Sequence, residues 1–237
     1  MSEVREAWHS DLARGIGLET TTLWDFPSQS PPGRRHGDAS FHGVTPTGVV
    51  ANLLARHTQP GDWVVDPMAG SGTTLDVARR MGRRVLGFDL APRRQDIHPA
   101  DAQHLPVPAG FAQLMFVDPP YGDNLRYSDD PRCLGTLSAE SEAFDFALGR
   151  VAREVDRVLR PKGIAAFLVS DQYRRSHFTP VGFALFSELE RRFRPVDIVA
   201  VPRRNDRTLN PHWEHWSRRA NFLLRGFRYL LIVRKEG

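Results

Sequence analysis

The sequence predicts an α/β protein with a mostly parallel sheet that helices cover on both faces. Apolar segments of strand length alternate with segments of helical periodicity along most of the 237 residues. Several strand segments are apolar throughout, which is typical of parallel strands buried on both faces. Four of them are followed by an acid, at Asp66, Asp89, Asp118 and Asp171. Ligands of such folds bind beyond the carboxyl ends of the strands, so these four side chains mark the expected site.

The first half of the chain is expected to form three strands with helices between them. Thr45 is the expected N-cap of the first helix, and Pro46 stands at its first helical position. Strands are predicted over residues 63–66, 85–89 and 113–117, and a helix over 73–81. A short loop and a short helix are expected before Asp101.

The second half begins with a polar loop over residues 122–138 and continues with longer elements. Apolar residues at helical spacing predict a helix over about 140–159. The remaining predicted elements are a strand at 164–169, a helix at 180–193, a strand at 196–201, and a closing strand or hairpin at 222–224 and 229–233.

Composition is that of a globular protein, with 41% hydrophobic and 25% charged residues. No apolar run reaches membrane-spanning length, and the first residues lack the apolar region of a signal peptide. The one cysteine, Cys133, excludes a disulfide framework. We therefore expect a cytoplasmic protein with an irregular arm over residues 1–40 and one domain over 41–237.

The net charge of +4 comes almost wholly from arginine, since Lys162 and Lys235 are the two lysines. Arginine pairs with phosphate in a bidentate fork and stacks on flat rings, which favours a nucleic-acid partner. A high-GC genome would enrich arginine equally well. The histidines show no metal-ligand spacing, so no metal site is predicted.

The turn Gly70-Ser71-Gly72 follows the strand that ends at Asp66 and opens the next helix. Glycines here let the backbone approach a ligand at a helix N-terminus. A P-loop is excluded because no Gly-Lys-Ser or Gly-Lys-Thr is present, and Leu75 stands where the dinucleotide fingerprint needs its third glycine. The turn therefore predicts a cradle for a different ligand.

Three acids around this turn indicate S-adenosylmethionine. Asp66 suits a cationic ligand, with an amino group or a sulfonium, better than it suits a pyrophosphate. Asp89 is placed to accept from two ribose hydroxyls, and Asp101 from an adenine amino group. Each acid taken alone would also fit a solvent-facing strand end.

Asp118-Pro119-Pro120-Tyr121 is the most specific pattern in the chain. Its prolines stiffen the backbone and remove two donors, which leaves a carboxylate and carbonyl oxygens as acceptors. Two acceptors can bind both hydrogens of an exocyclic amine and aim the nitrogen lone pair at a methyl group. Tyr121 could stack on a base taken out of the helix.

These two motifs resemble those of the S-adenosylmethionine-dependent DNA amino-methyltransferases that modify cytosine N4 or adenine N6. The stretch 66–74 looks like the family's cofactor motif, with Met68 where phenylalanine is common, and 118–121 looks like its catalytic motif. Thr45-Pro46 and the following helix look like the segment that closes over the methionine end. The resemblance implies a Rossmann-like class I methyltransferase with a seven-stranded sheet and no separate target-recognition domain.

The resemblance implies the following site. The catalytic residues are Asp118, Pro119, Pro120 and Tyr121. The cofactor-binding residues are Thr45, Pro46, Asp66, Pro67, Met68, Ala69, Gly70, Ser71, Gly72, Thr73, Asp89, Leu90, Asp101 and Ala102.

A basic and aromatic segment at 203–221 is the candidate DNA-contacting insertion. It carries Arg203, Arg204, Arg207, Trp213, Trp216, Arg218 and Arg219. Arginines bind phosphates or read guanine edges, and tryptophan can wedge or stack. The alternative is a basic surface loop whose tryptophans fold back onto the core.

We therefore predict a site-specific DNA methyltransferase that acts on an exocyclic amine, with cytosine N4 preferred to adenine N6. Its expected partner is double-stranded DNA with a flipped target base, and a cognate restriction endonuclease is a further candidate. The implied protein is a monomer or homodimer located at the nucleoid.

Four other functions are alternatives to this prediction. An RNA guanine-N2 methyltransferase is the nearest, since Asp118-Pro119-Pro120-Tyr121-Gly122 also resembles those enzymes. A non-catalytic DNA-binding protein and a nucleotide-dependent oxidoreductase are further alternatives. A cytosine C5 enzyme is disfavoured because Cys133 follows Arg132 rather than a proline.

Overall fold

The computed structural model describes residues 17–28, 30, 36–38, 44–122, 127–204 and 210–237. The helices are α2 (Thr47–His57), α3 (Thr73–Arg80), α4 (Glu142–Val158), α5 (Val181–Leu189) and α7 (Pro211–Arg219), with a 3₁₀ turn η1 at Leu134–Thr136. The strands are β1 (Trp63–Asp66), β2 (Arg84–Asp89), β3 (His98–Pro99), β4 (Ala112–Val117), β5 (Leu159–Val169), β6 (Gln172–Arg174), β7 (His177–Thr179), β8 (Arg194–Pro202) and β9 (Phe227–Arg234).

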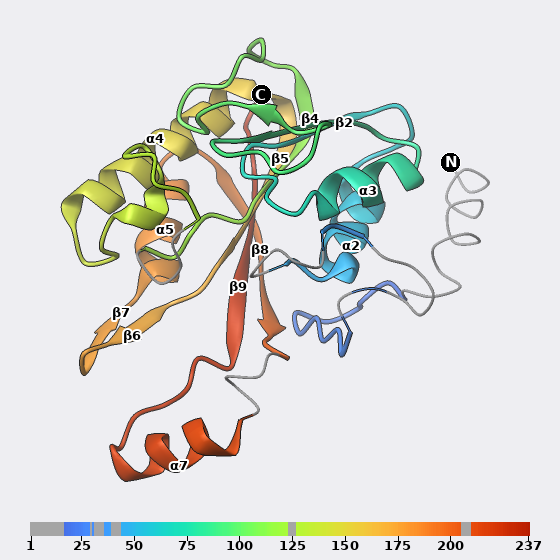
Figure 1. Ribbon diagram of the computed structural model, residues 1–237. Helices are drawn as coiled ribbons and strands as arrows, with labels where there is room; N and C mark the ends of the chain where they lie inside the picture. The colour runs from blue at the N-terminus through green and yellow to red at the C-terminus, as the bar shows by residue number, and fades with distance from the viewer. Residues whose placement is uncertain (1–16, 29, 31–35, 39–43, 123–126, 205–209) are drawn as a thin grey trace.

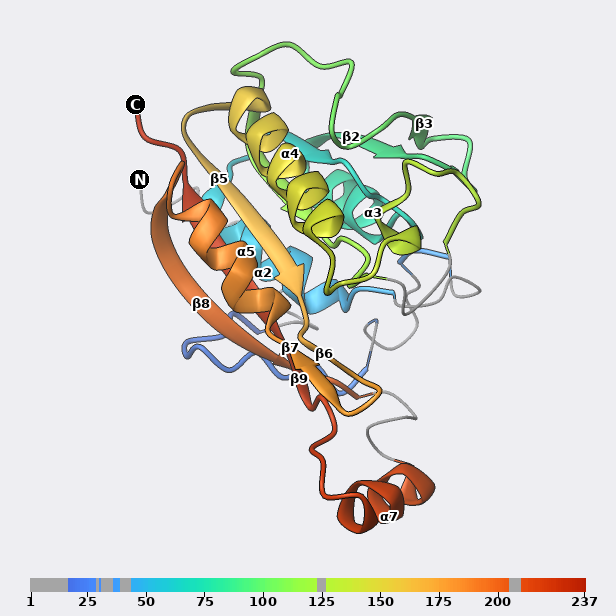
Figure 2. The ribbon, with the colours of Figure 1, turned by 90° about the vertical axis from the view of Figure 1, so that its left-hand side faces the viewer.

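Seven strands form one sheet in the order β3-β2-β1-β4-β5-β9-β8. All neighbours from β3 to β5 pair in parallel, whereas β9 pairs antiparallel with both β5 and β8. Helices α4 and α5 lie on one face and α2 and α3 on the other, as the two views show (Figures 1 and 2). The predicted mostly parallel, doubly covered sheet is confirmed.

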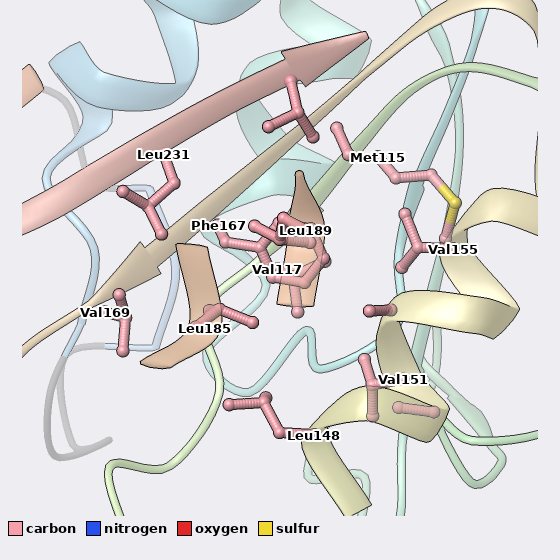
Figure 3. Close-up of a cluster of buried hydrophobic side chains, with 14 of the residues drawn as sticks. Met115, Val117, Leu148, Val151, Val155, Phe167, Val169, Leu185, Leu189 and Leu231 are labelled. Atoms are coloured by element: carbon pink, nitrogen blue, oxygen red, sulfur yellow. The ribbon is translucent and has the colours of Figure 1, made fainter. Parts of the chain in front are cut away.

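Alternate residues of the central strands supply two separate cores, because successive side chains of a strand point to opposite faces. On β4, Met115 and Val117 pack with α4 and α5, whereas Leu114 and Phe116 pack with α2 and α3. Figure 3 shows the first of these clusters, where Phe167 of β5 lies among leucines and valines of both helices. Burial on both faces explains why these strands are apolar throughout.

Residues 23 and 24 of the N-terminal arm pack against β8 at the edge of the sheet. Leu23 forms a parallel bridge to Ala200 of β8, and Trp24 beside it is buried. The ring of Phe26 lies over Gly48 of α2, where a Cβ atom would stand 2.3 Å from the ring. These contacts place residues 23–26 across one face of the domain.

Thr45 is not the N-cap that its position before Pro46 predicts. Helix α2 begins at Thr47, its N-cap position is held by Pro46 with φ −58° and ψ 130°, and no side chain caps the helix. The hydroxyl of Thr45 instead donates to Oδ2 of Asp118 at 2.7 Å. The Thr45 hydroxyl therefore binds a residue distant in the sequence instead of capping the helix that follows it.

Two other predictions about elements are wrong, and two elements were not predicted. The segment before Asp101 contains strand β3 and no helix, and β3 extends the sheet beside β2. Residues 222–224 lie outside any strand, so the chain closes with β9 alone. The pattern also gave no sign of the β6–β7 hairpin or of helix α7, which both project at one end of the molecule (Figure 2).

None of the helices in the described ranges is long and apolar enough to cross a membrane.

Candidate active site

A cavity of about 860 Å³ opens at the carboxyl ends of β1, β2, β4 and β5. The acids that follow these strands, Asp66, Asp89, Asp118 and Asp171, all line it, together with Asp101. Parallel strands end at one edge of a sheet, which is why residues far apart in the sequence meet here. This cavity therefore lies where the sequence predicts the ligand-binding site.

Backbone geometry at the glycine-rich turn requires glycine. Gly70 and Gly72 have φ values of 45° and 81°, in the left-handed region that other residues avoid. A Cβ atom on Gly72 would lie 2.3 Å from the Arg94 guanidinium. The turn thus delivers the N-terminus of α3 and the backbone of residues 69–71 to the cavity wall.

Asp66 is a buried acid of the site whose ionisation is disfavoured. Its side chain is buried, with the residue 3% exposed, and Oδ1 accepts from the amide of Met68 at 3.0 Å. Burial raises the pKa of Asp66 to about 7, and the nearby Asp118 and Asp89 add to the rise. A carboxylate that is costly to ionise here favours a cationic ligand, which would supply the missing positive charge.

Asp89 joins the second strand to the glycine-rich turn. Its Oδ2 atom accepts from the amide of Gly70 at 3.0 Å and Oδ1 from the amide of Ala91 at 2.9 Å. Each carboxylate oxygen can accept two hydrogen bonds, so both retain capacity for a ligand hydroxyl. Asp101 and the apolar side chains of Leu90 and Ala102 line the same part of the cavity.

These features fit S-adenosylmethionine. The cavity offers a buried carboxylate for a cationic amine or sulfonium, a carboxylate for ribose hydroxyls and an apolar wall for adenine. Among the predicted cofactor residues, all line the cavity except Gly72, whose carbonyl oxygen faces Arg94. Gly72 shapes the turn rather than the wall.

Three neighbouring side chains contact the carboxylate of Asp118, which lines the cavity. Oδ1 accepts from the Tyr121 hydroxyl at 3.0 Å and Oδ2 from the Thr45 hydroxyl at 2.7 Å. Nη1 of Arg228 lies 3.6 Å from Oδ2. Burial raises the pKa of Asp118, and the Arg228 guanidinium and the two hydroxyl groups partly offset that rise.

The Tyr121 ring is already covered on one side. The Arg203 guanidinium lies over it, with Cζ 5.7 Å from the ring centroid. Burial and the adjacent Asp118 raise the pKa of the Tyr121 hydroxyl, so this group stays protonated and donates to the carboxylate. Pro120 lines the cavity beside Tyr121, whereas Pro119 is buried and does not.

Arg228 is a site residue that sequence reasoning missed. It stands on β9, its residue exposure is 9%, and its Nε atom has no hydrogen-bond partner among the described residues. The sequence signal for this residue is an arginine inside the mainly apolar strand Phe227–Arg234. An arginine in a central strand is rarely buried without a partner. Its neighbour Asp118 lies 110 residues earlier in the chain.

The predicted DNA-contacting segment divides between the cavity and solvent. Arg203, Arg204 and Trp213 line the cavity mouth, while Trp216, Arg218 and Arg219 lie away from it. Helix α7 buries none of its residues, and Trp213 and Trp216 are 42% and 47% exposed. The tryptophans therefore do not fold back onto the core, and Arg207 lies outside the described residues.

Within the described ranges, no group of three or more His, Cys, Asp or Glu side chains is placed to hold a metal ion.

Residues 5–98 match the model of a family described as DNA methylase, the N6 and N4 methyltransferases. The chain is 33% identical over 91 residues to a type II methyltransferase, M.MjaII, of Methanocaldococcus jannaschii. It is 34% identical over 95 residues to the ribosomal protein L11 methyltransferase of Thermus thermophilus, and 43% identical over 44 residues to the type II methyltransferase M2.DpnII of Streptococcus pneumoniae.

These alignments cover 38%, 37% and 19% of this chain, and they span 17%, 36% and 16% of the three relatives. Among solved structures, TrmN of Thermus thermophilus superposes with a TM-score of 0.53 and 19% identity, over 82% of this chain and 50% of that one. That likeness establishes the fold. The family match supports the resemblance through the first of the two motifs, at 66–74, and ends before the second, at 118–121.

Proposed function

We propose that this relative of the DNA methylases transfers a methyl group from S-adenosylmethionine to an exocyclic amine of a DNA base, with cytosine N4 preferred to adenine N6. One observation carries the proposal. The buried Asp118 of the Asp-Pro-Pro-Tyr turn faces the same cavity as Asp66, Asp89 and the glycine-rich turn. An acceptor for an amine and a cradle for a methyl donor therefore share one enclosed space.

The residues that hold the cofactor lie on one side of that space. When bound, S-adenosylmethionine supplies a methyl group activated by its sulfonium. Asp66 binds the cationic part, Asp89 accepts from ribose hydroxyls, and Asp101 accepts from the adenine amine. Thr45 and Pro46 lie beside the glycine-rich turn at the cavity wall, where they cover the methionine end.

Asp118 binds the target amine and receives its proton. The carboxylate accepts one amine hydrogen and a backbone carbonyl of the turn 118–121 accepts the other, which directs the nitrogen lone pair at the methyl carbon. The N–C bond would form as the methyl–sulfur bond breaks and the sulfur leaves as a neutral thioether. The nitrogen would then carry a positive charge, and it would lose one proton to a carboxylate oxygen of Asp118. The hydroxyl of Thr45 donates a 2.7 Å hydrogen bond to Oδ2 of Asp118, which keeps the carboxylate in place. Alignment of this kind accounts for a large share of the rate in reactions between two bound groups.

The guanidinium groups near Asp118 favour cytosine. On its Watson–Crick edge cytosine presents two acceptors, N3 and O2, beside its N4 amine, whereas the same edge of adenine presents N1 alone beside N6, and N7 lies on the other edge. Arg228 lies 3.6 Å from Asp118, and Arg203 covers Tyr121. Two cationic donors next to one carboxylate match an edge of one amine and two acceptors. Adenine N6 is the second candidate.

Double-stranded DNA with a flipped base is the proposed substrate. Tyr121 stacks on the extruded base, and Arg203, Arg204 and helix α7 bind the DNA around it. The segment 41–237 acts as one catalytic domain, with residues 1–40 as an arm and 203–221 as the DNA-contacting insertion. A cognate restriction endonuclease is a candidate partner.

Methylation of DNA by the purified protein tests the proposal. The protein is incubated with radiolabelled S-adenosylmethionine and, in parallel, unmethylated bacterial DNA or bacterial RNA. Each nucleic acid is digested to nucleosides and analysed by mass spectrometry. We expect N4-methylcytosine, which Asp118→Ala abolishes. N6-methyladenine would overturn the preference for cytosine, and label in RNA alone would overturn the choice of DNA.

A further inference from the structure

The β6–β7 hairpin ends in a turn whose residues are unusual for its geometry. Arg174 pairs with His177, which leaves Arg175 and Ser176 as the two-residue connection. Both have positive φ, 50° and 62°. Two consecutive left-handed residues define a type I′ turn, for which Asn-Gly is strongly preferred. An arginine at the first position adopts an unfavourable backbone conformation that asparagine would adopt more readily.

The hairpin tip has a basic and aromatic surface. Residues 174–178 are all exposed, and Phe178 is 44% exposed. The segment 172–179 contains two arginines and a histidine but no acid. Arg175 keeps an unfavourable backbone conformation at an exposed tip. We therefore infer that its side chain has a function.

An aromatic and cationic stack fixes the hairpin to the segment that follows α7. Tyr173 of β6 stacks on Phe222 with centroids 5.3 Å apart and an angle of 7° between the rings. The Arg225 guanidinium lies over both Tyr173 and Phe178, at 6.0 Å and 5.3 Å. The hairpin and α7 project from the same end of the molecule (Figures 1 and 2). They form two neighbouring arms.

The base of the hairpin reaches the catalytic turn. Nε2 of Gln172 donates to the carbonyl oxygen of Tyr121 at 3.2 Å. Gln172, Tyr173, Phe222 and Arg225 all line the cavity that holds Asp118. The hairpin therefore begins at the cavity wall and projects from it (Figure 2), toward where the DNA backbone beside a base bound at Asp118 would pass.

We propose that the β6–β7 hairpin is a second DNA-binding arm, with Arg175 at its tip in contact with a backbone phosphate next to the target base. This inference rests on the proposed function. The two-residue turn restricts the backbone from which the Arg175 side chain extends. The phosphate contact positions the duplex over the cavity and carries no sequence information of its own.

A pair of turn variants separates the charge of the tip from its geometry. Ser176→Gly relieves the second turn position and keeps Arg175. Arg175→Asn combined with Ser176→Gly gives the preferred I′ pair and removes the charge. Both proteins should melt at or above the wild-type temperature and bind S-adenosylmethionine with unchanged affinity in calorimetry. Arg191→Asn, an exposed arginine beyond the far end of α5, is the matched control for loss of one charge.

DNA affinity is measured by fluorescence anisotropy with a duplex at several salt concentrations. The double variant should bind about eightfold more weakly at 0.1 M salt, and its slope of log affinity against log salt should be shallower by about 0.9, the value for one phosphate contact. Ser176→Gly and Arg191→Asn should stay within about twofold of wild type. Equal affinity and slope in the double variant would overturn the second arm.

The same data distinguish failure of the arm from failure of the proposed function. If the wild-type protein methylates and binds DNA while the double variant does so equally well, the arm alone is wrong. If the wild-type protein has no affinity for duplex DNA, the proposed function is wrong. A loss confined to binding of RNA would overturn a DNA arm in favour of an RNA contact.

Discussion

Nη1 of Arg228 lies 3.6 Å from Oδ2 of Asp118, and the two side chains are 10% and 15% exposed. The cation comes from the antiparallel strand β9 and the carboxylate from the turn after β4, with β5 between these strands. A buried carboxylate with a cation beside it stays ionised more easily than burial alone would allow. Strand β9 thus supplies a cation that favours the ionised form of Asp118.

Loss of Arg228 should move the pH dependence of methyl transfer. Arg228 opposes the rise that burial imposes on the pKa of Asp118. Arg228→Met should therefore raise that pKa further and move the acidic limb of the rate profile to higher pH, because Asp118 must be ionised to accept the amine. Arg228→Lys should restore much of the shift, since it keeps a positive charge. A profile of single-turnover rate against pH for both variants makes the measurement, and an unchanged acidic limb in Arg228→Met would contradict it.

Asp118→Ala should lower methyl transfer by at least about 100-fold, since a contact that positions reacting groups is commonly worth that factor. Cofactor affinity in calorimetry should stay within about twofold, because Asp118 contacts the amine rather than the cofactor cradle. The matched control is Asp197→Ala on the exposed part of β8, which should keep wild-type activity. Retention of more than a tenth of the activity in Asp118→Ala would remove its proposed role.

Asp66→Asn should stabilise the cofactor-free protein at high pH and weaken cofactor binding. The folded-state pKa of Asp66 is raised from 3.8 to about 7, so its stabilising contribution is complete below pH 3.8 and is lost as the pH rises through 7. At about 1.4 kcal/mol per pH unit, the loss is at most roughly 4 kcal/mol. Asparagine has no charge to bury and keeps an acceptor for Met68.

Thermal unfolding at pH 5 and pH 8 tests this expectation. The melting temperature of Asp66→Asn should exceed that of the wild type by several degrees at pH 8 and by less at pH 5. Its affinity for S-adenosylmethionine should fall about tenfold or more, because the charge that faces the cation is gone. Asp197→Asn controls for removal of an exposed carboxylate. Equal melting temperatures at pH 8 together with intact cofactor affinity would show that Asp66 neither pays a burial cost nor binds the cation.

Arg218→Ala with Arg219→Ala should weaken DNA binding without changing cofactor affinity. Both arginines are exposed in the last turn of α7, a helix that buries none of its residues. If both contact phosphates, the salt slope should become shallower by roughly one to two units. The control pair is Arg150→Ala with Arg153→Ala on the exposed face of α4. Unchanged affinity and slope in the α7 pair would leave DNA binding to the hairpin and the cavity mouth.

Trp216→Ala should melt within about one degree of the wild type, because a ring that is 47% exposed on an unpacked helix contributes little to the core. A buried tryptophan would cost about 3–5 kcal/mol on the same substitution. Differential scanning calorimetry decides between these outcomes. A loss of several degrees would place the ring in a packed interface.

Sequence periodicity determined the layered α/β fold and the position of its site. Strands buried on both faces must be apolar throughout, and helices on a sheet must show one apolar face, so both patterns are local and readable. The acids after β1, β2 and β4 were placed in one cavity by the rule that parallel strands end at a common edge. The glycine-rich turn was readable because Gly70 and Gly72 adopt backbone angles that other residues avoid.

Tertiary structure alone decided the features that depend on partners distant in the chain. Thr45 satisfied the local rule for an N-cap, yet its hydroxyl binds Asp118, 73 residues later. Arg228 reaches the site because β9 inserts antiparallel between β5 and β8, an order that no local pattern encodes. The three-residue strands of the β6–β7 hairpin are too short to show periodicity, and α7 has no apolar face buried against a core. Those contacts exist only once the sheet has brought separate segments together.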